Sequence, residues 1–360
     1  MSDRQPRRRL IAYAHGLDDP ACRFRIRQYI PCFEQAGWEV SLRTNHPPRP
    51  WDSPYRNPLL RWLYQRSGLI SRQLLRRWDI RAASRYDVAF LNRDLLGGCL
   101  DYEEILLRRN PHLVFDFDDA IFLGSKAGHI EWICRNAAWV TAGNEFLAEF
   151  ARQFTNRVTV LPTVVDTDAY LVRQPGHARL PVRVGWLGSD RSIRETLFPH
   201  LPMLARLQKD LGFEFIVVSR PRPEITAPGL GWTFVEWNPI IETKIAELFD
   251  IGIMPLIDDE FQRGKCGCKL LQYMAAGLPV VASPVGINEE LVPGRGFLAG
   301  PEEQWRQALR TLIGDSGCRA RMGNEGRTFV EQKYSRRVWF PVLLKIVENI
   351  AAARDDRENA

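Results

Sequence analysis

The sequence predicts an α/β protein with two Rossmann-like domains, each a parallel sheet covered by helices. Three observations support this prediction. The 360 residues suffice for two domains of ordinary size. In both halves, short apolar runs alternate with longer segments in which apolar residues recur at helical spacing. Between the halves, residues 167–181 (TDAYLVRQPGHARLP) show neither pattern, and we expect them to form a linker.

Composition narrows the class of protein further. Hydrophobic residues make up 45% of the chain and charged residues 26%, as in an ordinary globular protein. Apolar runs are too short to span a membrane, and MSDRQPRRRL precedes no apolar signal core, so we expect a cytoplasmic location. The seven cysteines form no CxxC pair, which indicates reduced thiols and no zinc site. A net charge of +6 permits anionic ligands, nucleic acids or membranes as partners and selects none of them.

The first domain, expected over residues 1–166, begins with a strand, a loop, a helix and a second strand. We expect strands at 9–15, 39–43, 87–91, 112–117, 138–141 and 158–161, and helices at 23–35, 103–109, 130–136 and 145–153. In an open parallel sheet, ligands bind beyond the carboxyl ends of the strands. Polar residues at the ends of these strands are therefore candidate ligand contacts: His15, Asn92 and Arg93.

Residues 44–84 combine apolar and basic residues in an unusual way. Residues 45–58 are rich in proline, and we expect them to be irregular. The pattern that follows predicts two short amphipathic helices with a break at Ser67 and Gly68. We favour packing of their apolar sides on the domain's own core. The alternative is that the basic segment 56–81 contacts an anionic membrane or a lipid-linked ligand, which would place the protein at the inner membrane face.

The second domain, expected over residues 182–335, repeats the alternation, and residues 336–360 follow as a last helical segment. We expect strands at 182–187, 213–219, 233–236, 251–256 and 279–282, and helices at 193–211, 240–249, 302–312, 315–333 and 336–353. A further helix begins near Lys269 and stops at Gly277. The free N–H groups at its start favour anions, and Lys265 and Lys269 add positive charge there. The sequence therefore predicts a diphosphate site.

The stretch from 250 to 292 resembles the donor-binding segment of family 4 glycosyltransferases of the GT-B fold. Lys269, the run YMAAGLPVVA at 273–282, and Gly286 with Glu290 carry the match. The resemblance implies two Rossmann-like domains that face a central cleft, with the C-terminal helix crossing back to the first domain. It also implies transfer of a sugar from a nucleoside diphosphate sugar to an acceptor hydroxyl, with retention of configuration and without a metal or other cofactor. Arg23 and Arg25 stand where related enzymes have a glycine-rich loop and nearby basic residues, which makes both candidate acceptor-side contacts.

The resemblance assigns provisional roles to the residues of the second domain. Positive charge at Lys265, Lys269 and Arg191 would stabilise the departing diphosphate. Other donor contacts would come from the turn after the domain's first strand and from the Gly-rich turn: Gly188, Ser189, Gly286 and Glu290. The family carries two glutamates separated by seven residues, and Gly264 and Gln272 occupy those positions here. Gln272 could still hydrogen-bond a ribose hydroxyl, and Asp258 could supply the other contact.

Asp116, Asp118 and Asp119 follow a predicted buried strand and allow three interpretations. A DxD pair can bind a metal–nucleotide complex, and a strand followed by DxD also begins a class of phosphatases. Alternatively, Asp118 or Asp119 lies where GT-B relatives keep a histidine, and binds a sugar hydroxyl or assists deprotonation of the acceptor. A capping or ion-paired acidic turn without a catalytic role is as plausible for any single one of them.

We therefore predict a glycosyltransferase of glycan biosynthesis that binds a nucleotide sugar and a glycan, lipid-linked or small-molecule acceptor. On this prediction, Lys265, Lys269, Asp118 and Asp119 are catalytic. A degenerate, non-catalytic GT-B protein that binds a nucleotide sugar or a partner protein is the first alternative, because both family glutamates are missing. The DxD phosphatase is the second. We expect no nucleic acid as partner, since the arginine-rich segment lacks an aromatic-interleaved reading motif.

Overall fold

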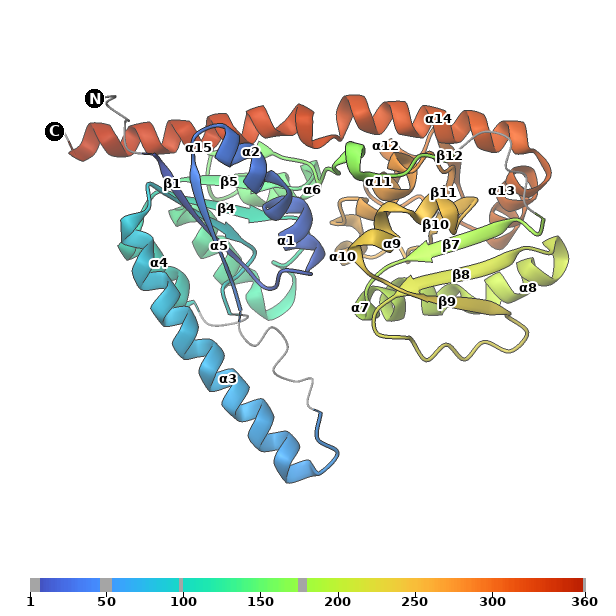
Figure 1. Ribbon diagram of the computed structural model, residues 1–360, viewed down its shortest axis with the longest axis horizontal. Helices are drawn as coiled ribbons and strands as arrows, with labels where there is room; N and C mark the ends of the chain where they lie inside the picture. Colours follow the sequence, from blue (N-terminus) through green and yellow to red (C-terminus); the bar gives the residue numbers. More distant parts are fainter. Residues whose placement is uncertain (1–6, 46–53, 97–99, 174–179, 359–360) are drawn as a thin grey trace. The chain divides into compact units, whose positions relative to one another are not determined.

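The computed structural model describes residues 7–45, 54–96, 100–173 and 180–358 (Figure 1). The proline-rich residues 46–53 and residues 174–179 of the expected linker lie outside these ranges. The chain packs as two compact units. The first comprises residues 1–163 and 339–360, and the second comprises residues 164–338. Residues 167–173, expected in the linker, belong to the second unit, where the Leu171 amide donates to the Thr243 carbonyl at 2.8 Å.

Within its described residues, the first unit holds a sheet of six parallel strands in the order β2-β1-β3-β4-β5-β6. The strands are β1 (Arg9–Ala14), β2 (Glu39–Thr44), β3 (Val88–Asn92), β4 (Leu113–Phe117), β5 (Trp139–Ala142) and β6 (Val158–Val160). The helices are α1 (Pro20–Arg25), α2 (Ile30–Gln35), α3 (Pro58–Arg81), α4 (Asp101–Arg109), α5 (Ala127–Asn136) and α6 (Glu145–Arg152). All residues of β3 and β4 are buried, as expected for central strands of a parallel sheet.

The helix expected at 23–35 is divided in two. It begins earlier, at Pro20, because the Asp19 carboxylate accepts a hydrogen bond from the Ala21 amide at 3.1 Å and Pro20 suits the first helical position. A short turn at Arg27–Tyr29 separates α1 from α2. Pro31 stands in the first turn of α2, where its missing N–H costs no hydrogen bond.

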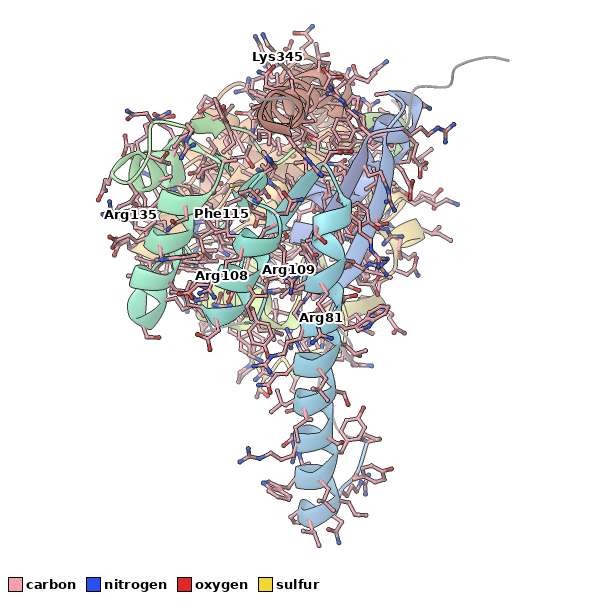
Figure 2. The ribbon with its side chains drawn as sticks, turned by 90° about the vertical axis from the view of Figure 1, so that its left-hand side faces the viewer. Arg81, Arg108, Arg109, Phe115, Arg135 and Lys345 are labelled. Carbon is pink, nitrogen blue, oxygen red and sulfur yellow. The ribbon has the colours of Figure 1, made fainter. Side chains whose placement is uncertain are left out.

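Two predictions for α3 are wrong. The segment forms one 24-residue helix instead of two. Gly68 lies inside this helix, where a glycine costs about 1 kcal/mol relative to alanine, and other interactions of the helix offset that cost. Asn57 caps its start, with its side chain accepting from the Leu59 and Leu60 amides. The apolar side chains also do not pack on the domain's core: only Arg76 and Ile80 of this helix are buried among the described residues. Figures 1 and 2 show α3 extending away from the sheet of its own unit.

In its described part, the second unit also has six parallel strands, in the order β12-β11-β10-β7-β8-β9. The strands are β7 (Arg183–Leu187), β8 (Glu214–Ser219), β9 (Trp232–Glu236), β10 (Ile251–Met254), β11 (Val280–Ala282) and β12 (Gly296–Leu298). The helices are α7 (Asp190–Ser192), α8 (Leu201–Leu211), α9 (Pro239–Thr243), α10 (Glu260–Arg263), α11 (Cys268–Ala275), α12 (Asn288–Leu291), α13 (Glu302–Gly314) and α14 (Ser316–Lys333). The sequence did not predict β12, α7, α10 or α12. The predicted fold class, with two Rossmann-like parallel sheets, is confirmed.

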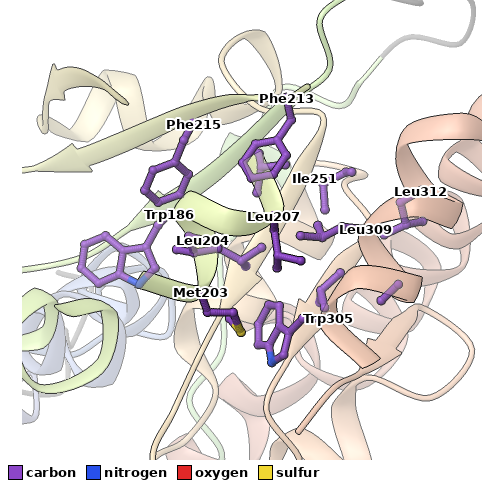
Figure 3. Close-up of a cluster of buried hydrophobic side chains, with 14 of the residues drawn as sticks. Trp186, Met203, Leu204, Leu207, Phe213, Phe215, Ile251, Trp305, Leu309 and Leu312 are labelled. Atoms are coloured by element: carbon purple, nitrogen blue, oxygen red, sulfur yellow. The ribbon is translucent and has the colours of Figure 1, made fainter. Parts of the chain in front are cut away.

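The core of the second unit forms where α8 and α13 pack on the sheet (Figure 3). Trp186 of β7 and Trp305 of α13 are both fully buried within it. On the side of α11, Gly252 lets the helix approach β10 closely, because a Cβ there would stand 2.4 Å from the Tyr273 ring. The Tyr273 hydroxyl then accepts a hydrogen bond from the Leu187 amide at 2.8 Å. Tyr273 therefore fixes α11 against the ends of both β7 and β10.

The last helix, α15 (Arg336–Glu358), begins in the second unit, and its residues from Trp339 onward belong to the first, as predicted. Phe340 packs against Phe33 and Tyr29, with ring centroids 5.1 and 6.1 Å away. Farther along, Leu343 and Val347 are fully buried. The C-terminal helix thus completes the hydrophobic packing of the first unit.

Candidate functional site

The strand order of the second unit reverses between β7 and β10. From β7 the chain continues through β8 and β9 on one side, and from β10 through β11 and β12 on the other. Ligands of open α/β sheets bind at such a switch point, beyond the carboxyl ends of the strands. The loop after β7 carries Gly188, Ser189 and Arg191, and the loop after β10 leads to Lys265 and Lys269. The topology therefore brings the predicted donor residues of both loops to one edge.

Lys269 crosses from the start of α11 to the loop after β7. Its Nζ donates to the Ser192 hydroxyl at 2.7 Å and lies 5.3 Å from the Trp186 ring centroid. Gly188 makes this path possible, because a Cβ there would stand 2.9 Å from the Lys269 Cε and 2.3 Å from the Trp186 ring. The ammonium group is therefore held at the switch point by two contacts from the neighbouring strand and loop.

Phe261 gathers two further cations. The Arg191 guanidinium lies 5.2 Å from its ring centroid, and the Lys265 ammonium lies 4.9 Å from the same centroid. Arg191 Nε also donates to the Glu195 carboxylate at 2.6 Å. Cations over an aromatic face are attracted by its electron-rich surface. Sequence reasoning missed Phe261, whose signal was a single aromatic residue inside a strongly charged loop.

The start of α11 adds a backbone contribution. Gly267 occupies the N-cap position with φ +65°, and it brings no side chain to cap the first N–H groups. A side chain there would also collide with Leu291, whose Cδ1 lies 2.4 Å from the Cβ position. No acidic residue stands in the first turn of α11. The helix dipole therefore presents positive potential beside Lys269.

Other predicted donor residues have contacts that constrain their roles. Asp258 forms an exposed two-contact ion pair with Arg263, at 2.7 and 3.0 Å, which lowers the pKa of its carboxyl. Gly264 is buried. Gly286, at φ +55°, approaches the backbone of Arg263 so closely that a Cβ would stand 2.6 Å from its carbonyl oxygen. Glu290 is exposed, and its carboxylate accepts a hydrogen bond from the Tyr334 hydroxyl at 2.8 Å.

Gln272 points into the unit's interior. It is 4% exposed, its amide nitrogen donates to the Tyr170 hydroxyl at 3.3 Å, and its oxygen lies 3.8 Å from the Cys268 thiol. Tyr170 in turn donates to Glu242 at 3.4 Å. This position therefore joins a buried polar network, and the predicted ribose contact would require Gln272 to exchange these partners.

In the first unit, Asp116 at the end of β4 is the centre of a buried polar network. Its carboxylate accepts hydrogen bonds from Arg25 at 2.5 and 3.1 Å, from Asn92 at 2.9 Å and from Thr141 at 2.7 Å. Asp116 is 0% and Arg25 1% exposed. Arg25 also donates to the Leu161 carbonyl at 2.6 Å. Arg25 and Asn92, predicted as acceptor contacts, here hold strands together.

The phosphatase interpretation does not fit this geometry. A nucleophilic carboxylate must reach a phosphorus atom, and the Asp116 oxygens are buried beneath four hydrogen bonds. Among the described residues, the structure also contains no group of three His, Cys, Asp or Glu side chains arranged to hold a metal ion.

Arg93 binds both remaining aspartates of the acidic turn. Its Nε donates to Asp118 at 2.9 Å and its terminal nitrogen to Asp119 at 2.5 Å. Arg93 has φ +63°, a backbone conformation that costs a residue with a side chain about 1–2 kcal/mol. The ion pairs and the Arg93 amide hydrogen bond to the Asp116 carbonyl, at 2.7 Å, offset this cost. The structure thus brings together three predicted residues, Arg93, Asp118 and Asp119.

His15 belongs to a neighbouring cluster at the end of β1. Its Nε2 lies 2.6 Å from the Asp94 carbonyl oxygen and 3.3 Å from the Asp94 carboxylate. Lys126 donates to the same carboxylate at 2.9 Å. Burial opposes ionisation of Asp94, but these two hydrogen bonds outweigh it and hold the pKa of the carboxyl below its usual range. Sequence reasoning missed Asp94 and Lys126. The Arg23 guanidinium lies 4.9 Å from the ring centroid of its neighbour Phe24.

A comparison of the sequence with known families identifies the second unit. Residues 184–315 match the model of the family described as Glycosyl transferases group 1. The chain carries a group 1 glycosyltransferase domain. The predicted family resemblance and the predicted enzyme class are confirmed by this match. Among curated protein sequences, none matches this glycosyltransferase significantly.

Solved glycosyltransferases share the fold at low sequence identity. Sucrose-phosphate synthase (tll1590) from Thermosynechococcus elongatus aligns with a TM-score of 0.68 at 15% identity, over 96% of this chain and 100% of its own. Anabaena Alr3699/HepE in complex with UDP-glucose aligns with a TM-score of 0.64 at 16% identity, over 97% and 99%. The lipopolysaccharide outer core galactosyltransferase WaaB, in its apo form, gives 0.58 at 12%, over 96% and 99%. This glycosyltransferase therefore has the GT-B fold.

Proposed function

We propose that this glycosyltransferase binds a nucleoside diphosphate sugar in its second unit and transfers the sugar to an acceptor hydroxyl. The gathering of Arg191, Lys265 and Lys269 at one switch point, beside the start of α11, carries the proposal. A diphosphate matches this arrangement of positive charge and backbone N–H groups. The complex of Anabaena Alr3699/HepE with UDP-glucose supports a UDP-sugar as the first donor to test.

The chemistry explains why fixed positive charge is needed. The bond from the anomeric carbon to the diphosphate oxygen breaks, and the diphosphate leaves with the bonding electrons. Cations positioned at the leaving oxygens stabilise the charge that develops in the transition state, and one well-placed group contributes about 100- to 1,000-fold in rate. We propose that Lys269 and Lys265 supply this stabilisation without a metal ion. Retention of the anomeric configuration is also part of the proposal, and the resemblance to family 4 glycosyltransferases supports it.

In this proposal, the residues that contact the acceptor belong to the first unit. Asp118 and Asp119 stand at the carboxyl end of β4, and Arg93 keeps both carboxylates in fixed positions. A carboxylate so held can accept a hydrogen bond from a sugar hydroxyl or receive the proton that the acceptor loses. His15, whose side chain is 29% exposed, is a further acceptor contact in this proposal. The acceptor is a hydroxyl of a glycan, a lipid-linked sugar or a small molecule.

A donor screen and two substitutions test the proposal. UDP-, GDP- and ADP-sugars are added separately to the full chain, and one class is expected to raise the melting temperature by mass action. Lys269→Ala and Lys265→Ala should each remove most of the turnover with that donor while the melting temperature without ligand stays unchanged. Near-normal turnover in both variants would contradict the role of the lysines, and no shift with any donor would contradict donor binding.

The buried side chain of Gln272 favours a second candidate function. Gly264 and Gln272 replace the two family glutamates, and the Gln272 amide is engaged by Tyr170. A protein that binds a nucleotide sugar without transferring it is consistent with this loss. Slow release of free sugar from the donor separates the two functions, because donor hydrolysis requires a working catalytic site.

A further inference from the structure

Helix α3 is amphipathic, and its apolar side faces away from its own unit. From Leu59 to Trp78, the leucine, isoleucine and tryptophan side chains of α3 are 43–65% exposed. The less exposed positions up to Arg76 recur every three or four residues and form a separate, mostly polar side: Tyr64, Gln65, Gly68, Arg72 and Arg76. In a helix that packs on a core, the apolar side chains are buried and the polar side chains are exposed. Isolated exposed apolar residues are common, but a continuous row of them indicates a binding surface.

The C-terminal end of α3 is fixed to the unit by polar contacts. Arg76 donates to the Asn45 side chain at 3.0 Å and to the Ala14 carbonyl at 3.1 Å. The Tyr13 hydroxyl donates to the Asp79 carbonyl at 3.1 Å, and Ile80 is fully buried. Burial lowers the pKa of Arg76 to about 10, so this guanidinium stays charged at neutral pH. These contacts anchor the last two turns, and the rest of α3 projects outward with its side chains exposed (Figure 2).

The charge of α3 restricts what can cover its apolar side. Residues 58–81 contain six arginines and one acidic residue, Asp79. Arg61, Arg66 and Arg77 are exposed. A second copy of α3 would place these arginines against one another, and like charges across an interface are repulsive. An anionic lipid surface, in contrast, can pair with the arginines while its acyl boundary receives the apolar side chains.

The aromatic residues of α3 fit the same partner. Trp62 and Trp78 are 52% and 65% exposed, and the Arg66 guanidinium lies 5.6 Å from the Trp62 ring. Tryptophan is enriched where acyl chains meet headgroups, because its ring is apolar and its N–H needs a hydrogen-bond acceptor. No helix among the described residues is long and apolar enough to cross a membrane, so the contact would be with the surface.

We propose that α3 docks this protein on a membrane surface rich in anionic phospholipids. Its leucines, Ile70 and tryptophans enter the boundary between headgroups and acyl chains, and its arginines pair with the lipid phosphates. The Arg76 and Ile80 contacts transmit this attachment to the first unit.

Co-sedimentation of the full chain with vesicles tests the proposal. Vesicles of equal parts phosphatidylcholine and phosphatidylglycerol are expected to bind the protein, and pure phosphatidylcholine vesicles to bind it at least tenfold more weakly. The triple variant Trp62→Ser, Leu63→Ser, Ile70→Ser should lose at least tenfold in binding. Ile240→Ser is the matched control, because Ile240 is 67% exposed on α9 of the second unit. Unchanged binding of the triple variant would overturn the proposal.

Charge is tested separately. Arg61→Gln with Arg66→Gln should weaken binding to the mixed vesicles several-fold and reduce its dependence on salt. Lys209→Gln with Arg310→Gln, two exposed basic positions of the second unit, should leave binding unchanged. Equal binding to both vesicle types would overturn the anionic requirement. If the serine variant instead abolishes a concentration-dependent dimer, a second copy covers α3 and the proposal is wrong. Donor-induced thermal shifts should be the same in all these variants, so this outcome is independent of the proposed function.

Discussion

In both units, cations lie at the edge of the sheet where the carboxyl ends of the strands meet, but the cations of the two units have different partners. In the first unit, Arg25 binds Asp116, Arg93 binds Asp118 and Asp119, and Lys126 binds Asp94. In the second unit, Lys269 contacts the Ser192 hydroxyl and the Trp186 ring, and Lys265 contacts the Phe261 ring. Arg191 shares the Phe261 ring but also pairs with the Glu195 carboxylate, so the contrast with the first edge rests on the two lysines.

This difference suggests a division of roles. A carboxylate fixes a cation and also cancels its charge, whereas an aromatic face or a hydroxyl fixes it without contributing a negative charge. The first edge therefore suits neutral, hydroxyl-rich ligands, and the second suits an anion. If this comparison is correct, substitutions at the first edge act mainly on stability and those at the second mainly on turnover.

The largest effect is expected for Asp116→Asn. It leaves the Arg25 guanidinium buried without its carboxylate, which typically costs about 3–5 kcal/mol in the free energy of unfolding. Urea unfolding measures the loss. Glu131→Gln breaks the exposed ion pair with Arg135 and should cost less than about 1 kcal/mol. Equal losses in the two variants would contradict the structural role of the Asp116 network.

Lys269→Ala should lower kcat/KM about 100- to 1,000-fold, the effect of removing one preorganised charge from a transition state. Lys269 is half-buried, but its contacts with the Ser192 hydroxyl and the Trp186 ring contribute only about 1 kcal/mol each, so the midpoint of thermal unfolding should change little. Steady-state assays with the donor found by thermal shift measure the rate, and Lys209→Ala on α8 is the basic control. A marked loss of stability with Lys269→Ala would remove the contrast between the two edges.

Phe261→Leu should lower kcat/KM about tenfold, because it removes two cation–π contacts that each contribute about 0.5–1 kcal/mol. Arg191 and Lys265 remain present but lose the aromatic ring that contacts both side chains. Phe261→Tyr keeps the ring and should retain most of the activity. If the tyrosine variant is as slow as the leucine variant, Phe261 acts through packing and not through its aromatic face.

The last prediction concerns the contribution of Asp94 to stability at the first edge and its dependence on pH. Its pKa is depressed in the folded state, so its contribution to stability is fully present above the unfolded pKa of about 4 and is lost as pH falls through the folded value. Asp94→Asn should therefore cost about 1–3 kcal/mol at pH 7 and progressively less below pH 4. Urea midpoints of both proteins between pH 7 and pH 3 measure the difference; a constant difference would contradict the assignment.

Much of the architecture could be predicted from the sequence. Apolar runs identified eleven of the described strands. The positions of Arg191 after β7 and of Lys265 and Lys269 at the start of α11 followed from the alternation of elements. β12 was missed because Gly296–Leu298 contains no β-branched residue, whereas the equally short β6 and β11 each contain two valines. Phe261 was missed because its significance depends on two cations that approach from different loops.

Burial and orientation were harder to predict than the elements. The acidic turn after β4 was interpreted as a group of similar aspartates, but Asp116 is buried because Arg25, Asn92 and Thr141 reach it from positions 91, 24 and 25 residues away. For α3 the amphipathic pattern was visible, but not which side faces the unit. That is decided by the anchoring of Arg76 on Asn45, 31 residues away in sequence.

The route of α15 has a consequence for biosynthesis. Residues 1–163 of the first unit are translated before the second unit, yet the Phe340 ring that packs on Phe33 and Tyr29 is translated after it. Until then the aromatic surface of α2 remains open to solvent or to chaperones. Although N-terminal domains generally fold first, the first unit of this protein can complete its hydrophobic packing only after the second unit has been synthesised.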